Sequence, residues 1–407
     1  MTINGLAKIL ESSAATGCAP DPTTTVVPAH GVHGPPPDIP GRTSMRTFGV
    51  EEELLVVDPS SGIPLPLAGQ ILAEVAAGAH GAQMGRAGDI THEFKLEQIE
   101  VATAPCRTAV ELLDGIRAGR ELADAGARSV GARLAAVGTP PVHGPTHAAP
   151  DSRYAAMEER FGLIAAEQIT CGCHVHVSID SPAEGVAVLN GLRPWLPTLL
   201  ALSANSPYWN GQDSGFASYR TQVWNRWPAT GPTSHFTSMR AYRSFMAAIT
   251  AAGVLLDEGM VYFDARLSRR HPTIEVRIAD VCLEADDAAV IAALVRALVA
   301  TSAQDWQLRT ITRPAPTAVL RLGNWLGSRF GTSGELLHPT DLLPRPAAEV
   351  VAALFDHVER SFDGPAERAY VESGLAKILI RGTGERCQRS ARDRHGRLSD
   401  AVAAAFV

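Results

Sequence analysis

The sequence predicts a globular fold in which β-strands alternate with α-helices, and two observations lead to that prediction. The first is composition: 45% of the 407 residues are hydrophobic and 19% are charged, which is typical of a folded chain. The second is periodicity. Segments in which polar and apolar residues alternate, as in strands, are interspersed along the chain with Ala-rich segments that have a helical period. A chain of this length can bury a sizeable core, as one large domain or two ordinary ones.

The first 45 residues differ from the rest of the chain. The stretch "DPTTTVVPAHGVHGPPPDIPGRTS" is rich in Pro, Thr and Gly and has no hydrophobic period, so residues 1–45 are predicted to be a disordered tail. Met45 directly precedes the first strong strand pattern and is a candidate translation start, which N-terminal sequencing of the native protein would test. We expect residues 46–407 to form a single folded domain.

Four strands are predicted where apolar residues recur at alternate positions, at residues 47–57, 93–102, 168–179 and 273–279. Helical patterns cover residues 109–136, 183–203, 237–252 and 286–308, and shorter ones begin at Ala347 and Pro365. Residues 206–233 hold three tryptophans without a clear period, so we expect a functional loop there.

The charge of the chain limits its partners. A net charge of −7 disfavours a nucleic acid or an acidic membrane as partner, because either would attract a basic surface. Only three residues are lysines, so a site for anionic substrates would have to be built from arginine, which binds carboxylates and phosphates in bidentate fashion.

The six cysteines are too sparse for a disulfide framework in a chain of this length. Cys171 and Cys173 form a C-x-C pair, with no second pair to complete a zinc site. No apolar run reaches the roughly 18 residues that a membrane span needs. We therefore expect reduced thiols in a cytoplasmic protein.

Each predicted strand carries two polar residues on one face, because side chains at positions i and i+2 of a strand project together. In chain order the pairs are Glu51 with Glu53, Gln98 with Glu100, His174 with His176, and Glu275 with Arg277. Glu52 points to the opposite face from its two neighbours. Several carboxylates on one buried face repel one another, so cations have to compensate them. Oxygen ligands in that number favour Mg²⁺ or Mn²⁺ over Zn²⁺.

Each pair also has an ordinary explanation. Two glutamates at a strand start are more often solvated than bound to a metal. A His-x-His pair can lie on the surface or belong to a zinc site, and a Glu-x-Arg pair can be a weak ion pair. Four such pairs on four strands are less commonplace, and the residues alone therefore indicate a metal-dependent enzyme for an anionic substrate. The motifs of P-loop nucleotide sites, dinucleotide-binding folds, zincins and serine hydrolases are missing.

The motifs do resemble those of a known family. "FGVEEELLVVDP", "QIEVATAP", "CGCHVHVSID", "SANSPYWNGQDSGFASYRTQVWNRWP" and "TIEVRIADVC" are similar to segments of the carboxylate–amine ligases of the type 2 glutamate–cysteine ligase family, in the same order. The resemblance runs from Arg46 to the C-terminal "GTGERCQR". It implies an α+β, glutamine-synthetase-like fold, in which an antiparallel sheet forms a funnel backed by helices. It also implies that the single domain is catalytic and binds ATP with Mg²⁺ or Mn²⁺.

The resemblance also implies roles for individual residues. The implied metal ligands are Glu51, Glu53, Glu100, His174 and Glu275, of which Glu53 and His174 are also catalytic candidates. Arg277 is implied to meet the transferred phosphoryl group, and the implied contacts to the nucleotide are Arg277, His176 and Arg329. The candidate substrate contacts are Gln98, Tyr219, Arg220, Trp224 and Arg226, although the tryptophans of that loop could equally pack it onto the sheet.

The reaction that the resemblance implies joins two small molecules. The γ-carboxylate of glutamate attacks ATP to give an acyl phosphate and ADP, and an amine then displaces phosphate to leave an amide. One departure concerns the amine: where the family usually has Trp-Arg-x-x-Arg, this chain keeps Trp325 and Arg329 but has Leu326 at the first Arg. Cysteine is therefore one candidate among several amines.

Two other functions stay open at this point. One is a metal-dependent hydrolase that uses His174, His176 and a carboxylate to activate water. The other is a non-catalytic relative that binds a nucleotide or an amino acid. A homodimer is expected only as the commonest oligomeric state.

Overall fold

The computed structural model describes residues 45–78, 88–310 and 314–407. The predicted tail, apart from Met45, lies outside these described residues. Within them the chain forms a central antiparallel sheet with helices on both sides.

The sheet has the strand order β10-β11-β5-β1-β3-β2, with β4 also paired to β1. Its strands are β1 (Phe48–Val57), β2 (Ile90–His92), β3 (Gln98–Ala102), β4 (Arg133–Ala135), β5 (Gly172–Ser178), β10 (Ala265–Leu267) and β11 (Thr273–Asp280). Every pairing in this sheet is antiparallel, as the family resemblance implied. The longest strand, β1, lies at the centre and is paired on both sides, so its register sets the position of its neighbours.

One face of the sheet is the main hydrophobic core. It packs against α4 (Ala109–Ser129), α7 (Pro182–Leu192), α8 (Leu196–Ser203) and α11 (Ala285–Gln307). Glu52 points to this side and is buried, where Arg120 of α4 binds it with two hydrogen bonds of 2.8 Å. The middle glutamate of "EEE" is thus part of a buried ion pair that joins the central strand to a helix, and Glu51 and Glu53 are left to face the other way.

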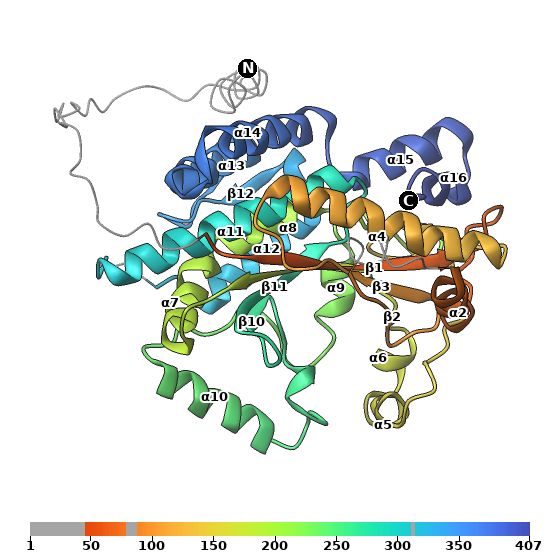
Figure 1. Ribbon diagram of the computed structural model, residues 1–407, viewed down its shortest axis with the longest axis horizontal. Helices are drawn as coiled ribbons and strands as arrows, with labels where there is room; N and C mark the ends of the chain where they lie inside the picture. Colours follow the sequence, from red (N-terminus) through yellow and green to blue (C-terminus); the bar gives the residue numbers. More distant parts are fainter. Residues whose placement is uncertain (1–44, 79–87, 311–313) are drawn as a thin grey trace.

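The opposite face is the funnel. Figure 1 shows α5 (Ser152–Phe161), α6 (Leu163–Ala166) and α10 (Met239–Ala251) on the far side of the sheet from α11. The short helix α9 (Arg220–Trp224) lies between them. A smaller apolar cluster joins the α5–α6 segment to the segment after α10. These elements wall the funnel around the polar face of the sheet.

The remaining elements lie around this core. The helices are α2 (Ala68–Gly78), α12 (Thr317–Phe330), α13 (Ala347–Val358), α14 (Gly364–Arg381), α15 (Gly384–His395) and α16 (Leu398–Ala403). Two-stranded sheets are formed by β6 (Tyr208–Trp209) with β7 (Gln212–Asp213), β8 (Thr230–Gly231) with β9 (Tyr262–Phe263), and β12 (Glu335–Leu337) with β13 (Pro344–Pro346).

Three element predictions need correction. The predicted strand at 93–102 is a strand only in its second half, because residues 93–97 form the turn between β2 and β3. The predicted helix at 183–203 is interrupted after Leu192 by a 3₁₀ turn at Arg193–Trp195, where Pro194 removes a backbone donor. The helix predicted over 109–136 ends at Ser129, and β4 follows.

The described part of the chain has no helix long and apolar enough to cross a membrane. All five cysteines in it are free thiols, and four of these are buried.

Candidate active site

The strand register brings the predicted polar pairs side by side. Across β1 and β3, Glu53 is paired with Glu100, and across β1 and β5, Glu51 is paired with His174. Across β5 and β11, His176 is paired with Glu275. Because directly paired residues of antiparallel strands point to the same side, these side chains share the funnel face.

The side chains form three overlapping groups, each with ligand atoms within 4.8 Å of one another. The groups are Glu51 with Glu100 and His174, Glu51 with His176 and Glu275, and Glu53 with Glu93 and Glu100. We call these seven residues the carboxylate–histidine cluster. Glu51 and Glu100 each belong to two groups, so the cluster can hold more than one cation through shared carboxylates.

On one side of the cluster, two histidines contact Glu51. His174 Nδ1 lies 3.4 Å from Glu51 Oε2, and His176 Nε2 lies 3.3 Å from Glu51 Oε1. Burial alone would raise the pKa of Glu51, but the hydrogen bonds and charges of these two imidazoles outweigh it and hold the pKa well below its ordinary value. Glu51 is therefore a carboxylate anion over the whole neutral range.

Repulsion dominates at the other side of the cluster. Burial, and to a smaller extent the charge of Glu53, raises the pKa of Glu93 to about 7. Burial and the charges of Glu93 and Glu51 raise the pKa of Glu100 well above its ordinary value. Carboxyl groups in this position hold their protons unless a cation replaces them, which is the behaviour expected of a metal site.

Glu93 is the site residue that the sequence patterns missed. It lies in the turn after β2 rather than on a strand, and Phe94 donates a backbone hydrogen bond of 2.6 Å to its Oε2. A pattern search over alternate strand positions cannot find a turn residue. Only the hairpin of β2 and β3, which folds Glu93 back beside Glu100, brings it into the cluster.

Arg277 is the buried cation beside the cluster. Its guanidinium binds Glu275 and lies about 6 Å from the ring centres of Trp224 and Tyr262. Arg266 of β10 binds Glu275 as well, at 2.8 Å. Burial raises the pKa of Glu275, but the charges of Arg277 and Arg266 outweigh this and lower it to about 2. The Nε atom of Arg277 is buried and has no hydrogen-bond partner within the described residues, so this donor is available to a ligand.

Two of the predicted substrate contacts are engaged inside the protein. Arg220 is buried against Gly172 and donates to the backbone oxygens of Ile278 and Arg277, at 3.3 Å each. Gln98 donates to the backbone oxygen of Thr170 at 2.8 Å. The guanidinium therefore ties α9 to the sheet, and the amide group ties the segment before β5 to it.

The other three predicted substrate contacts are side chains on and around α9. The ring of Trp224 packs at a tilt against that of Tyr262, with ring centres 4.8 Å apart, and its indole N–H donates to the Tyr262 backbone oxygen. Arg226 binds Glu167 at 2.5 Å, but its Nη2 is buried and unpaired within the described chain. Tyr219 packs between the rings of Trp209 and Phe216. The structure thus brings Trp224 next to Arg277, whereas direct contact of these side chains with a substrate stays a prediction.

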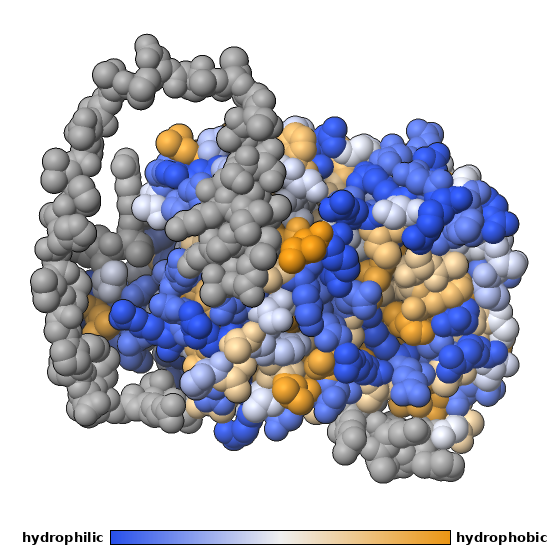
Figure 2. Space-filling view, turned by 90° about the horizontal axis from the view of Figure 1, so that it is seen from above, coloured by the Kyte–Doolittle hydropathy of each residue, from blue (hydrophilic) through white to orange (hydrophobic). Residues whose placement is uncertain are grey.

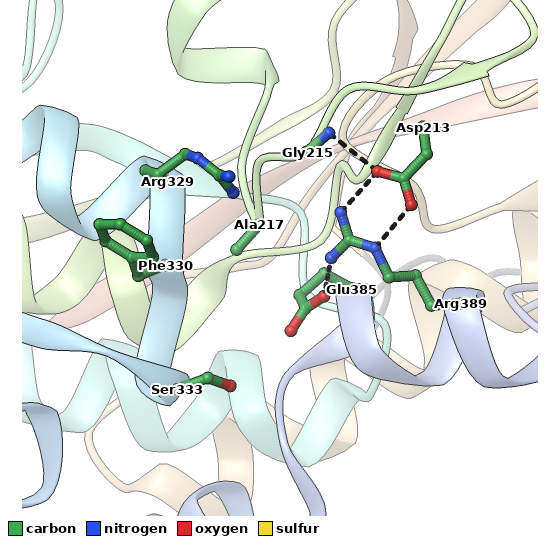
Figure 3. Close-up of a pocket in the computed structure, with 8 residues that line it drawn as sticks. All are labelled: Asp213, Gly215, Ala217, Arg329, Phe330, Ser333, Glu385 and Arg389. Atoms are coloured by element: carbon green, nitrogen blue, oxygen red, sulfur yellow. Dashed lines mark hydrogen bonds and ion pairs between the residues drawn. The ribbon is translucent and has the colours of Figure 1, made fainter.

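Arg329 lies elsewhere. It lines a pocket with Asp213, Gly215, Ala217, Phe330, Ser333, Glu385 and Arg389, to which no member of the carboxylate–histidine cluster contributes (Figure 3). Leu326, the departure from the family pattern, is half-buried one turn earlier on the same helix. Arg329 therefore lies outside the group of side chains assembled by the sheet, and its contact with the nucleotide stays a prediction.

A further pocket of about 470 Å³ lies at the edge of the sheet, between α10 and the β10–β11 hairpin. Arg266 and Thr273 line it, and both reach the cluster: Arg266 binds Glu275, and the Thr273 hydroxyl bonds His176 Nδ1 at 3.0 Å. Its apolar wall is formed by Met239, Tyr242, Met246 and Leu267. This pocket therefore opens directly beside the carboxylate–histidine cluster.

Comparison with known sequences gives matches over most of the chain. The family model described as glutamate–cysteine ligase family 2 matches residues 47–404. A Paenarthrobacter aurescens protein provisionally named glutamate–cysteine ligase 2-1 is 57% identical over 368 residues, which are 90% of this chain and 96% of that protein. A Streptomyces coelicolor protein provisionally named glutamate–cysteine ligase 2 is 44% identical over 360 residues, 88% of this chain and 98% of its own.

Two solved structures share the fold. The glutamate–cysteine ligase of Francisella tularensis in complex with AMP has a TM-score of 0.62 and 15% identity, and covers 88% of this chain and 87% of its own. A bifunctional glutathione synthetase from Pasteurella multocida has a TM-score of 0.61 and 15% identity, over 88% of this chain and 51% of its own. The α+β fold that the resemblance implied, an antiparallel sheet backed by helices, is confirmed.

Proposed function

Because the chain belongs to glutamate–cysteine ligase family 2 and is a ligase, we propose that it uses ATP to join the γ-carboxylate of glutamate to an amine. The product would be a γ-glutamyl amide, with ADP and phosphate released. The observation that carries the proposal is the sheet face on which five carboxylates and two imidazoles lie beside a buried arginine.

The donor set fits Mg²⁺ or Mn²⁺. Five carboxylates against two imidazoles are a hard, oxygen-rich set, and all except Glu93 come from strands of a sheet that keeps them apart by strand spacing. The ligands in this proposal are Glu51, Glu53, Glu93, Glu100, His174 and Glu275. Divalent ions bound here would neutralise the phosphates of ATP as the phosphoryl group is transferred.

Arg277 is the residue proposed to contact the transferred phosphoryl group. It is held by Glu275 on one side and by Trp224 and Tyr262 on the other, and its free Nε is a buried donor. A fixed guanidinium in a site with little water stabilises the charge on equatorial phosphoryl oxygens without having to reorganise.

The proposed reaction has two steps. An oxygen of the γ-carboxylate attacks the γ-phosphorus of ATP, the bond to ADP breaks, and an acyl phosphate forms. The amine nitrogen then attacks the acyl carbon, the bond to phosphate breaks, and the nitrogen loses a proton to leave the amide. Water would hydrolyse the acyl phosphate, and the aromatic wall of Trp224, Trp227 and Tyr262 is suited to exclude it.

The nucleotide is proposed to enter from the sheet edge, with its base in the pocket beside α10. Apolar side chains there offer surfaces for a flat base, while Arg243 and Arg269 offer donors for the ribose or phosphates. His176, at the inner end of this pocket through Thr273, is then the histidine closest to the nucleotide. The acid and the amine would bind on the α9 side, where the unpaired Nη2 of Arg226 is suited to a carboxylate.

The experiment measures ADP release by purified protein with ATP, Mg²⁺ and glutamate, with and without a panel of amines, followed by mass spectrometry. Amine-dependent ADP release with a γ-glutamyl product is the expected result, and it names the amine. ATP binding without ADP release under any acid and amine would remove glutamate as the acid. Turnover of an amide or ester without ATP would favour the hydrolase instead.

We place the enzyme in the cytoplasm, a proposal supported by the five free thiols of the described chain. The homodimer remains a prediction, to be tested by light scattering.

A further inference from the structure

The pocket that contains Arg329 is a separate feature of the molecule. It has a volume of about 520 Å³ and lies between the segment after β7, the C-terminal end of α12 and the N-terminal end of α15 (Figure 3). Figure 3 shows two arginines, Arg329 and Arg389, on facing walls. The two differ in what they bind, and this difference is informative.

Arg389 is saturated by the protein. Its Nε and Nη2 donate to the two carboxylate oxygens of Asp213 at 3.0 and 2.9 Å, Nη2 also donates to the backbone oxygen of Phe216, and Nη1 binds Glu385. Asp213 is saturated in turn, since Gly215 donates its backbone N–H to Oδ1. This network is a structural wall and leaves little for a ligand.

Arg329 has no such partner. Within the described residues its side chain makes no hydrogen bond and no ion pair, although the residue is half-buried. Its guanidinium is nevertheless held, 5.4 Å from the ring of Phe216 and 5.2 Å from that of Phe330. A Cβ added at Gly215 would lie 3.7 Å from Nη2, so the guanidinium lies close against the glycine backbone. An arginine fixed by aromatic rings, with its donors unused, is preorganised for an oxyanion.

The pocket is joined to the active site through hydrogen bonds. Ala217 and Ser218 donate their backbone N–H groups to the oxygen of Ser328, the neighbour of Arg329. The Ser218 hydroxyl donates to Asp280 of β11 at 2.8 Å. Two residues later α9 begins, and it carries Trp224 against Arg277. A ligand that tightens the segment at 213–218 would therefore act on the position of α9.

We propose that this pocket is an effector site that binds a small oxyanion, a carboxylate or phosphate group, through the planar donors of Arg329. Amino-acid carboxylates and inorganic phosphate are two sources of that chemistry. A metal ion does not fit, because the free group on the wall is a cation. The site is distinct from the proposed nucleotide pocket, whose lining residues it does not share.

The test is calorimetric titration of the full chain with inorganic phosphate and, separately, with glutarate, without divalent ions or nucleotide. We expect Arg329→Gln to weaken binding of the preferred anion at least about tenfold, as loss of a charge-assisted bidentate contact predicts. The matched control is Arg321→Gln, on the exposed part of the same helix and outside the pocket, which is expected to bind as the unaltered chain does.

A second titration with Mg²⁺ and ATP separates the effector site from the active site. Arg329→Gln is expected to keep the affinity for ATP within about twofold, a difference of less than 0.5 kcal/mol. Stronger binding of phosphate or of glutarate identifies the group, and either result supports the proposal. Unchanged anion binding by Arg329→Gln, or a loss of ATP affinity comparable with the loss of anion affinity, overturns it. Arg329→Lys serves as a second variant if the first does not fold, and is expected to bind with intermediate affinity.

Discussion

The three consecutive glutamates have two different roles, which depend on the face of the strand from which each side chain projects. Glu51 and Glu53 face the funnel, whereas Glu52 faces the core and binds Arg120. Each can be replaced by glutamine with almost no change in volume. Matched substitutions at neighbouring positions therefore separate a role in turnover from a role in stability.

Glu51→Gln is expected to abolish amine-dependent ADP release while the melting temperature falls only modestly, because glutamine loses the interactions with His174 and His176 that favour the Glu51 anion. Glu51 belongs to two of the three metal groups, and its loss also removes repulsion from Glu100. Measurements of ADP release and thermal unfolding on the same preparation check this. Full activity of the variant would remove Glu51 from the set of metal ligands.

The neighbouring control is Glu52→Gln. It leaves Arg120 as a buried charge without its partner, which typically costs about 3 kcal/mol. We expect a clear fall in the free energy of unfolding, measured by denaturant titration, and residual activity in whatever fraction stays folded. A variant as stable as the unaltered protein would contradict the assignment of Glu52 to the fold.

Trp224→Leu tests the aromatic support of Arg277. A partly buried cation–π contact contributes about 1 kcal/mol, so kcat should fall about fivefold to tenfold with little change in KM for ATP. Trp224→Phe keeps a ring at the same place and should lose less. A rise in KM for the acid with unchanged kcat would instead assign Trp224 to substrate binding.

At the scale of elements, the register of one strand places most of the site. Pairs at alternate positions of β1, β5 and β11 could be predicted from sequence because each strand has a regular period and one buried face. Glu93 could not, because its position depends on where a hairpin turns, and a turn has no period. Arg220 could not either: its burial depends on a glycine of another strand, which sequence spacing does not report.

Gly172→Ala tests that contact between β5 and α9. A Cβ at this position would lie 2.2 Å from Arg220 Nη2 and 2.8 Å from its Cζ, and the buried guanidinium is held by two backbone oxygens. We expect a loss of about 1–3 kcal/mol in unfolding free energy, as for overpacking, together with lower activity because α9 is displaced.

The control for it is Gly69→Ala, where a Cβ on an exposed helical position meets nothing within 4 Å. Alanine in a helix is favoured over glycine by about 0.5–1 kcal/mol, so this variant should be as stable as the unaltered protein or more so. Equal behaviour of the two alanine variants in denaturant would refute the proposed β5–α9 contact.

At the scale of the whole molecule, the funnel concentrates negative charge inside a fold that has to bury it. The sheet at the base of the funnel could be predicted from sequence, because four strands carry polar pairs at alternate positions. The walls of the funnel could not: α5, α6, α9 and α10 come from segments whose helical period says nothing about which side of a sheet they cover (Figure 1).

Mg²⁺ is therefore expected to stabilise the protein as a whole. At about 100 times its dissociation constant, a ligand of the native state adds about 2.7 kcal/mol, which should raise the melting temperature by several degrees. NaCl of equal ionic strength is the control and should not reproduce the shift. In Glu100→Gln the metal-free protein should melt higher than the unaltered chain, and the shift with Mg²⁺ should shrink. An unchanged melting temperature with Mg²⁺ would argue against the metal site.

The central strand β1 also limits how this enzyme can diversify. Since side chains alternate along it, inserting or deleting one residue before Glu51 would turn Glu52 into the funnel and send two carboxylates into the apolar core. Fold and chemistry would fail together, so this segment should tolerate almost no change in length. New substrate preferences are then to be sought in segments such as α5 and α10, which can change without disturbing that alternation.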